Sequence, residues 1–494
     1  MNNLLNISTF CHNAVAQLGY DPSQPLMFSS GLFWVLFLLF LPLYALLRNR
    51  QTQMMLFVTA FSLLLMYKSS GWYLLLLVAT SLFDFFIARR IAASTDNRTR
   101  RTLLITSIVL SAGTLVAFKY TNFLLFNLDA IIGRNFQPLD IVLPIGISFY
   151  TFRTISYVVD VYKNKLSPTD NYLEYIFFLS YFPCLVAGPI VRAVDFLPQI
   201  RQPRRLSSSM VWGGMWLVML GILKKAVAAD YLAQYVNIAF GNPEGYSGVE
   251  LLMAILGYTM QIYLDFSGYS DMAIGLGRIM GFDLGVNFDS PYRSLNVTEF
   301  WRRWHISLSL WLRDYIYIAL GGNRRGRTRQ YINLMATMLI GGLWHGAAWK
   351  FIFWGAGHGA ALCGHKALMP WLKRIPDTPV VKFCSWLITF VIVSLLWVFF
   401  RADSFEVACE VIGGTFSRFD LAYLPVFAQV RNTWCIVLVL AFALHYLPDG
   451  VCADLRRRFI AAPWAVKLAL FVILVQLVLQ FSAADVQPFI YAQF

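Results

Sequence analysis

Residues 29–47 read SSGLFWVLFLLFLPLYALL, a run without a charged side chain that ends at Arg48. An α-helix needs about 20 apolar residues to cross the roughly 30 Å hydrocarbon core of a bilayer. This stretch has that length and composition. It therefore predicts a membrane-embedded helix rather than the core of a soluble domain.

Apolar blocks of the same kind recur along most of the chain. Further candidate spans are 53–67, 71–88, 103–126, 141–160, 173–190, 211–229, 249–265, 331–349, 350–368, 383–400, 434–447 and 464–481. We expect an all-α polytopic membrane protein with about 11–13 transmembrane or re-entrant helices. Since no internal repeat or soluble domain is recognisable, residues 1–494 are expected to form a single membrane domain.

The composition indicates that the bilayer is the solvent of this chain. Of its 494 residues, 58% are apolar and only 13% are charged, and the mean hydropathy is +0.59. The net charge of +14 does not indicate nucleic acid binding, because the arginines occupy short loops between apolar blocks. Cytoplasmic loops of membrane proteins are rich in Lys and Arg, which explains this charge more simply.

The charge distribution also predicts an orientation. Residues 1–28 contain no Lys or Arg, so they lack the basic region of a cleavable signal peptide, and we expect them outside the cytoplasm. The loops that carry Arg48 and residues 89–101 are then cytoplasmic. Block 173–190 has basic residues on both sides and contains Pro183 and Pro189. We expect it to enter the membrane and return.

His345 is the strongest candidate for a functional histidine. It ends a nearly uncharged block, GGLWHGAA at 341–348, in which Gly341 and Gly342 lie one helical turn before it. These glycines leave a notch beside the imidazole for a small ligand or for a neighbouring backbone. A functional histidine and a histidine in a helix-packing seam both fit this pattern. We favour function, because an ionisable group at membrane depth is costly.

His305 lies in the segment 300–317. Five side chains of that segment recur at spacings of three and four: Trp301, Trp304, Leu308, Trp311 and Tyr315. This periodicity predicts one amphipathic helix with an apolar stripe. His305 falls at the protein-facing edge of the stripe, where a general base and a histidine that only packs are both consistent with the pattern.

His358 and His365 are seven residues apart, so they share one face of a helix. No carboxylate or cysteine stands at metal-ligand spacing beside them. We expect structural hydrogen bonds at both histidines and no metal site.

Asp265 and Asp271 flank an expected helix break. A buried carboxylate needs a cationic partner, which Arg278, Arg302 or Arg303 could supply. We interpret both carboxylates as structural rather than catalytic.

A basic loop with Arg324, Arg325, Arg327 and Arg329 follows the segment 300–317. The first explanation is that these arginines mark a cytoplasmic loop. The second is a site for the phosphates of a donor such as coenzyme A, because guanidinium groups match phosphate oxygens. No Walker or dinucleotide glycine motif occurs, so nucleotide hydrolysis has no support.

A set of ordered motifs is similar to the membrane-bound O-acyltransferase family, in particular to its bacterial branch that O-acetylates alginate. The motifs are LPIGISFYTF at 143–152, LVAGPIVR at 185–192, the runs 265–277 and 300–324, GGLWHG at 341–346 and WGAGHG at 354–359. They place the catalytic core at residues 140–365, followed by C-terminal helices at 366–494.

The resemblance implies tilted helices around a central funnel that opens to the cytoplasm, with a narrow path to the outer face. His345 matches the family's signature active-site histidine, and His305 matches a second important histidine of this branch. The resemblance also implies acetyl-CoA as donor, the bacterial inner membrane as location, and an extracytoplasmic acetylesterase-like partner that completes transfer to a polysaccharide.

The chemistry of a thioester donor is compatible with these residues. A thioester is already activated, so transfer needs a base, hydrogen-bond donors for the oxyanion and exclusion of water, and neither a metal nor a redox cofactor. We expect His345 to be the base, or the group that binds the carbonyl and shuttles the proton, and His305 to orient the donor or to assist. The residues expected to bind the donor are Arg302, Arg303, Trp304, Asn323, Arg324 and Arg325.

Two alternatives to polysaccharide O-acetylation remain. One is transfer of D-alanine from a carrier protein to teichoic acid, as in a distantly similar branch. The other is a polytopic transporter, which would have two pseudo-symmetric halves. The clustering of histidines in one half of the chain favours the enzyme.

Overall fold

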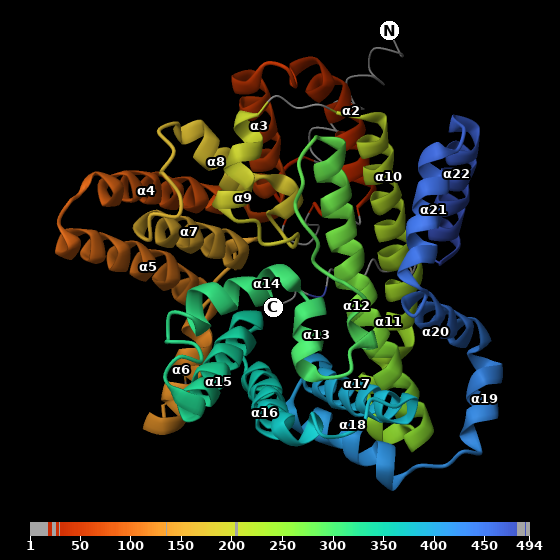
Figure 1. The fold of residues 1–494 in the computed structure, drawn as a ribbon. Helices are drawn as coiled ribbons and strands as arrows, with labels where there is room; N and C mark the ends of the chain where they lie inside the picture. The colour runs from red at the N-terminus through yellow and green to blue at the C-terminus, as the bar shows by residue number, and fades with distance from the viewer. Residues whose placement is uncertain are drawn as a thin grey trace. The chain divides into compact units, whose positions relative to one another are not determined.

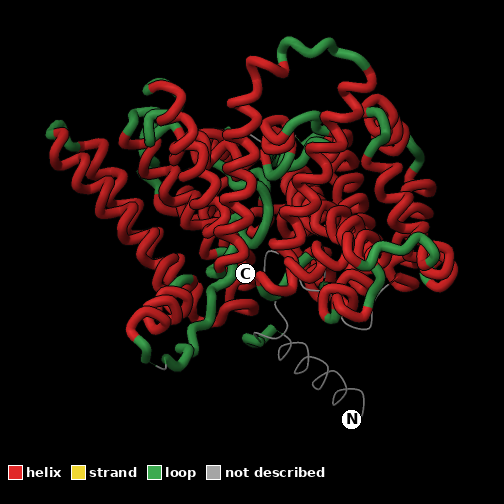
Figure 2. The backbone as a smooth tube through the Cα atoms, turned by 90° about the horizontal axis from the view of Figure 1, so that it is seen from below, coloured by secondary structure: helices red, strands yellow, loops and turns green. Residues whose placement is uncertain are grey.

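The computed structural model describes residues 18–21, 26–28, 30–134, 136–202, 206–481 and 490. Among these residues the regular elements are all helical and no strand occurs (Figure 2). The predicted all-α polytopic class is confirmed. Most of the segment 1–28 lies outside the described residues. The chain forms two compact units, residues 1–186 with 191–205, and residues 187–190 with 206–494.

The first unit contains helices α2 to α9. They are α2 (Gly31–Leu47), α3 (Gln51–Ser70), α4 (Leu74–Ala93), α5 (Asn97–Lys119), α6 (Thr121–Ile132), α7 (Ile147–Tyr162), α8 (Tyr172–Ser180) and α9 (Ala193–Arg201). Helices α4, α5 and α7 pack against one another (Figure 1). Buried Asp84 of α4 accepts a hydrogen bond of 2.5 Å from Ser107 of α5, which joins two of these helices through a polar contact.

The predicted re-entrant block 173–190 is only partly helical. Helix α8 has nine residues, and a 3-10 turn at Phe182–Cys184 and irregular chain follow it. The buried guanidinium of Arg153 donates to the carbonyl oxygens of Phe178 and Leu179 at 3.2 and 3.0 Å. It thereby satisfies carbonyls that the end of α8 leaves open. A helix this short cannot cross a bilayer, which is consistent with a segment that enters and returns.

The second unit contains the remaining helices. They are α10 (Ser208–Ile222), the π-helix η3 (Leu223–Ala229), α11 (Asp230–Gly241), α12 (Gly248–Ile279), α13 (Val297–Arg303), α14 (Ile306–Leu312), the π-helix η6 (Arg313–Tyr317), α15 (Gly326–His345), α16 (Trp349–Leu372), α17 (Pro379–Arg401), α18 (Phe405–Ser417), α19 (Tyr423–Val430), α20 (Asn432–His445), α21 (Asp449–Ala461) and α22 (Trp464–Phe481). Helices α10 and α11 run beside α12 (Figure 1).

Six helical stretches of the described residues are long and apolar enough to cross a membrane. They are Gln51–Ala93, Asn97–Lys119, Ser208–Gly241, Gly248–Ile279, Pro379–Arg401 and Trp464–Phe481. The bent pair α19 and α20 raises the number to seven if it is one span. The chain is therefore a multi-pass membrane protein.

Glycine contacts define one end of the second unit. Gly214 of α10 lies so close to Gly275 of α12 that a side chain at either position would meet the other's carbonyl oxygen. The start of α10 and the end of α12 therefore lie together. The guanidinium of Arg456 in α21 lies against Gly213 at the same end. Arg293 donates to the carbonyl oxygen of His445 and to the carboxylate of Asp449, which begins α21. These contacts lie nearer the middle of α12, because the neighbouring Tyr292 donates to the carbonyl oxygen of Thr259.

The opposite end of the second unit contains the start of α16. The guanidinium of Arg401, at the end of α17, lies 5.6 Å from the ring centroid of Phe240 at the end of α11. Lys350 in the first turn of α16 donates to the carbonyl oxygen of Ala402 at 2.7 Å. Helix α16 thus begins at the end of the unit where α11 ends.

The expected helix break between Asp265 and Asp271 is wrong. Helix α12 continues without interruption from Gly248 to Ile279. Gly268, which lies between the two carboxylates, permits close packing, because a Cβ there would meet the carbonyl oxygen of Gly221. The glycine serves helix contact rather than a turn.

The expected single helix at 300–317 is also wrong. Helix α13 ends at Arg303, and His305 has the left-handed backbone angles φ 42° and ψ 56° before α14 begins. At the break, Ile306 donates its backbone N–H to Asn287, and Asp289 donates to Arg303, both at 2.9 Å. These tertiary bonds replace the helical ones. The apolar stripe is nevertheless buried from Trp301 to Trp311, as expected.

Candidate active site

His345 is the last residue of α15 and is 3% exposed. Gly342, three residues before His345, permits close packing between two helices. A Cβ at Gly342 would collide with the carbonyl oxygen of Phe351 and touch Gly355, both in α16. The expected notch is therefore occupied by neighbouring backbone, and this packing holds the end of α15 firmly against α16.

Aromatic rings enclose the imidazole of His345. Its centroid is 5.0 Å from the rings of Trp344 and Trp354 and 5.3 Å from the ring of Phe400. The ring of Trp354 meets the imidazole edge to face, at 88°. These rings, contributed by α15, α16 and α17, exclude bulk water from the histidine and fix its position.

His305 is fully buried in the left-handed turn between α13 and α14. Its Nδ1 lies 3.1 Å from Oδ1 of Asn287, which also accepts from the hydroxyl of Ser307 at 2.8 Å. Because the amide oxygen only accepts, Nδ1 of His305 carries the hydrogen. Burial lowers the pKa of His305 to about 3, so its ring is neutral near pH 7.

One indole neighbours both predicted histidines. The ring of Trp344 is 5.0 Å from that of His345 and 6.2 Å from that of His305. The structure therefore brings both histidines into one aromatic cluster around Trp344. A neutral, hydrogen-bonded His305 is suited to positioning its neighbours.

His358 and His365 make the structural hydrogen bonds that were expected. Nδ1 of His358 accepts from the indole N–H of Trp301 at 3.3 Å, and Nδ1 of His365 is 2.8 Å from the hydroxyl of Thr298. Within the part of the chain that the structure describes, no three His, Cys, Asp or Glu side chains are grouped to hold a metal ion.

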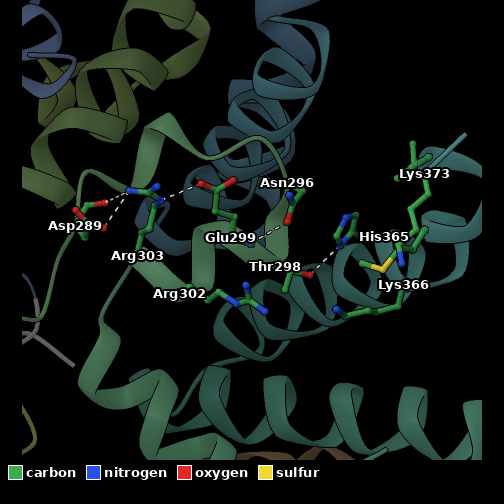
Figure 3. Close-up of a pocket in the computed structure, with 11 residues that line it drawn as sticks. Asp289, Asn296, Thr298, Glu299, Arg302, Arg303, His365, Lys366 and Lys373 are labelled. Atoms are coloured by element: carbon green, nitrogen blue, oxygen red, sulfur yellow. Dashed lines mark hydrogen bonds and ion pairs between the residues drawn. The ribbon is translucent and has the colours of Figure 1, made fainter. Parts of the chain in front are cut away.

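A cationic pocket of about 670 Å³ opens between α13 and the C-terminal half of α16 (Figure 3). Its lining includes Thr298, Arg302, Arg303, His365, Lys366 and Lys373. Arg303 is held by Asp289 and Glu299, each at 3.0 Å. Arg302 and Lys366 extend toward the same space and make no ion pair with any described residue. Such a pocket suits an anionic ligand.

The structure separates the residues expected to bind a donor. Arg302 and Arg303 line the pocket, whereas the other four lie elsewhere. Trp304 is fully buried against Phe300 and Trp397. The run 323–325 is an exposed turn before α15. Sequence reasoning missed Lys366 and Lys373, whose only signal was their position after the apolar part of block 350–368.

Helix α16 connects the pocket to the enclosed histidine. His365 lines the pocket, and Trp354 contacts His345. With a rise of 1.5 Å per residue, Trp354 and His365 are about 16 Å apart along the helix axis. Between them, His358 contacts both Trp354 and Trp301.

The partners expected for the two carboxylates of α12 are wrong. Asp265 lies 2.5 Å from Nζ of Lys225, and Asp271 lies 2.7 Å from Nζ of Lys224. These consecutive lysines belong to the π-helix η3, which packs along α12. The carboxylates contribute to helix packing, as expected, but lysines and not arginines neutralise them.

The buried His345 thus lies within an aromatic enclosure, and α16 connects this enclosure to a cationic pocket. Comparison with known proteins identifies the class. The model of the membrane-bound O-acyltransferase family matches residues 162–402, a range that includes His305, His345 and the whole pocket.

Curated relatives extend this similarity over most of the chain. The chain is 39% identical over 427 residues to the probable alginate O-acetylase of Azotobacter vinelandii, covering 85% of this chain and 84% of that protein. It is 39% identical over 358 residues to the peptidoglycan O-acetyltransferase of Helicobacter pylori, covering 67% and 68%. It is 26% identical over 282 residues to the teichoic acid D-alanyltransferase of Bacillus subtilis, covering 54% and 71%. The chain belongs to the membrane-bound O-acyltransferase family and is an O-acyltransferase.

Proposed function

We propose that this protein transfers acetyl from cytoplasmic acetyl-CoA to a hydroxyl that delivers it to an extracytoplasmic polysaccharide, in the inner membrane of a bacterium. The observation that carries the proposal is the placement of His345 in an aromatic enclosure at one end of α16, whose other end lines a cationic pocket. Relatives that are named for O-acetylation of alginate and of peptidoglycan support the polysaccharide acceptor.

The cationic pocket is the proposed site for the phosphates of acetyl-CoA. Arg302 offers a planar fork for phosphate oxygens, and Lys366 and Lys373 add point charges. Arg303 shapes the wall through its ion pairs with Asp289 and Glu299. Arg324 and Arg325, in the exposed turn with Asn323, add positive potential that attracts the donor.

The proposed orientation places this pocket on the cytoplasmic side. Arg278 ends α12, and Arg456 to Arg458 lie on α21 at the same end of the second unit. Arg293 ties the chain before α13 to the start of α21, the helix that carries these arginines, through Asp449. An excess of arginine marks cytoplasmic ends. Acetyl would then move along α16 from its cytoplasmic C-terminal end toward its N-terminal end, in the direction of His345.

The proposed chemistry assigns one task to each histidine. His345 removes the proton of the acceptor hydroxyl as the oxygen attacks the thioester carbonyl, and later returns a proton to the leaving thiolate. His305, neutral and bonded to Asn287, positions Trp344 against His345. An extracytoplasmic acetylesterase-like transferase is the proposed partner that passes acetyl on to the polysaccharide.

The test uses the full-length protein in lipid nanodiscs with acetyl-CoA that is labelled in its acetyl group. Free thiol and labelled product are measured with alginate oligomers and with peptidoglycan fragments as acceptors. We expect His345→Ala to lower transfer by at least about 100-fold while the protein elutes and melts like the wild type. A folded His345→Ala protein with wild-type transfer contradicts the assignment of the base.

The same assay separates acetyl transfer from D-alanyl transfer. The relatives named teichoic acid D-alanyltransferase are 26% and 29% identical to this chain. A D-alanyl thioester on a carrier protein is therefore offered as the competing donor. Turnover with that donor and none with acetyl-CoA would replace the proposal by this second candidate.

A further inference from the structure

Two hydrogen-bond donors of the aromatic cluster around His345 have no acceptor among the residues that the structure describes. Trp354 and His358 lie on successive turns of α16, are fully buried, and have ring centroids 4.8 Å apart. Neither Nε1 of Trp354 nor Nε2 of His358 has a hydrogen-bond partner among the described residues. A buried polar atom without a partner destabilises a fold by about 1–3 kcal/mol, so two such atoms together need an explanation.

The contact with Trp301 determines which nitrogen of His358 is the donor. An indole N–H can only donate, and that of Trp301 points at Nδ1 of His358 at 3.3 Å. Nδ1 must therefore be the unprotonated nitrogen of the ring. The hydrogen of the neutral imidazole then sits on Nε2, the atom without a partner.

Both open atoms are thus donors, and no open acceptor accompanies them on α16. A site of two donors matches an oxygen that carries negative charge better than it matches a water molecule, which also donates. The site adjoins the proposed base, because the ring of Trp354 contacts both His358 and His345. Trp397 also has an open indole N–H. Its ring neighbours are Trp304, Trp354, His358 and Phe400, and they do not include the proposed base His345.

We propose that the N–H groups of Trp354 and His358 form the oxyanion site of acyl transfer, which binds the thioester carbonyl oxygen. This inference rests on the proposed function. The acceptor oxygen forms a bond to the carbonyl carbon, the π pair moves to the carbonyl oxygen, and the hydroxyl proton moves to His345. The two N–H groups stabilise that oxyanion. Its collapse re-forms the carbonyl and breaks the C–S bond, and the thiolate leaves and takes the proton from His345.

In this scheme Trp354 and His358 contact the reacting carbonyl, and Trp301 is a positioning residue. Removal of Trp301 as a donor leaves the hydrogen of His358 free to occupy either nitrogen. Only the tautomer with hydrogen on Nε2 supports the oxyanion. Loss of the Trp301 contact therefore weakens the site without removing either donor.

The first experiment compares Trp354→Phe with Trp397→Phe in nanodiscs. Both changes remove one buried, open indole N–H and keep an aromatic ring. We expect Trp354→Phe to lower kcat about 100-fold with KM for acetyl-CoA unchanged, because an oxyanion donor acts in the transition state. Trp397→Phe is expected to retain kcat within a factor of about three, since its indole does not contact His345.

The second experiment reads the carbonyl directly. The probe is the ketone analogue of acetyl-CoA in which CH₂ replaces the sulfur, labelled with ¹³C at the carbonyl. We expect the infrared carbonyl stretch of the bound probe to shift to lower frequency in the wild type and in Trp397→Phe. The shift should be lost in Trp354→Phe, retained in part in His358→Gln, whose amide N–H₂ can replace Nε2–H, and reduced in Trp301→Phe.

The outcomes distinguish failure of the proposed function from failure of the oxyanion site alone. A wild-type protein that releases no thiol from acetyl-CoA overturns the proposed function and the oxyanion site with it. If the wild type is active and His345→Ala is not, a Trp354→Phe protein with wild-type kcat and carbonyl shift overturns the oxyanion site alone. Equal losses in Trp354→Phe and Trp397→Phe also overturn it, because they indicate a shared packing effect.

Discussion

Nζ of Lys225 lies 2.5 Å from Oδ1 of Asp265, and both side chains are 2% exposed. Asp230 shares the same ammonium at 2.8 Å, so one buried cation serves two carboxylates. The backbone N–H of Ile490 donates to the second oxygen of Asp265 at 3.0 Å. Loss of this cation should therefore destabilise the fold more than loss of either carboxylate.

We expect Lys225→Met to destabilise the protein by about 3–5 kcal/mol, because it leaves two buried carboxylates without a cation. Asp265→Asn should destabilise it far less. The Lys225–Asp230 pair remains neutral in that variant, and the amide oxygen can still accept from Ile490. Thermal unfolding in detergent, monitored as the loss of the monodisperse elution peak, shows which of the two variants is less stable. Equal destabilisation by the two variants would show that the charge balance is unimportant.

The buried His305 predicts a dependence of stability on pH. Burial lowers the pKa of its ring from 6.5 to about 3, so the unfolded chain binds the proton more tightly than the folded one. The contribution to stability is complete above pH 6.5 and is lost as the pH falls toward 3, by up to about 1.4 kcal/mol per pH unit.

We expect the denaturation midpoint of the wild type to fall more steeply between about pH 6 and pH 4.5 than that of His305→Asn. Asparagine tolerates the left-handed backbone and can keep the hydrogen bond to Asn287. Parallel pH profiles for the two proteins are the contrary result.

The contact between Gly342 and Phe351 predicts that a methyl group is not tolerated between α15 and α16. Gly342→Ala should destabilise the protein by about 1–3 kcal/mol and reduce transfer, because it moves His345 away from Trp354. Gly364→Ala in the same α16 is the matched control. Nothing lies within 4 Å of a Cβ at that position, and alanine favours the helix by up to about 1 kcal/mol. Melting temperature and transfer rate together distinguish the two variants.

The cationic pocket predicts effects on donor binding. We expect Arg302→Gln and Lys366→Gln each to raise KM for acetyl-CoA about 5–10-fold with little change in kcat, and more so at low ionic strength. Arg327, exposed in the first turn of α15, supplies the control, and Arg327→Gln should leave KM nearly unchanged. Titration of KM against salt for the three variants measures the difference. Similar effects at all three sites would indicate a diffuse field instead of a pocket.

The helical membrane class and the position of His345 could be predicted because both rest on local pattern. Apolar blocks predict helices from composition alone, and the run 341–348 places His345 at the end of one. Lys224 and Lys225 also gave a readable signal that was missed. Two lysines inside the apolar block 211–229 are ionisable groups at membrane depth, which require partners.

Other features depend on tertiary contacts that no local pattern contains. The left-handed turn at His305 exists because Asn287 and Asp289 supply backbone hydrogen bonds from a distant segment. The pocket combines Arg302 with Lys366, from two helices whose proximity the sequence does not reveal. The run 323–325 looked equally suitable for phosphate, yet it forms an exposed turn outside the pocket.

Helix α16 is regular between Trp354 and His365, so the distance between these two residues is fixed by the helix geometry. Insertion of one residue in that stretch would lengthen it by 1.5 Å and rotate its far end by about 100°. Either change would turn Lys366 away from Arg302 or Trp354 away from His345. A ligand that occupies both ends of this stretch must therefore have one fixed length. A change of that length by single residues would disrupt one of the two ends.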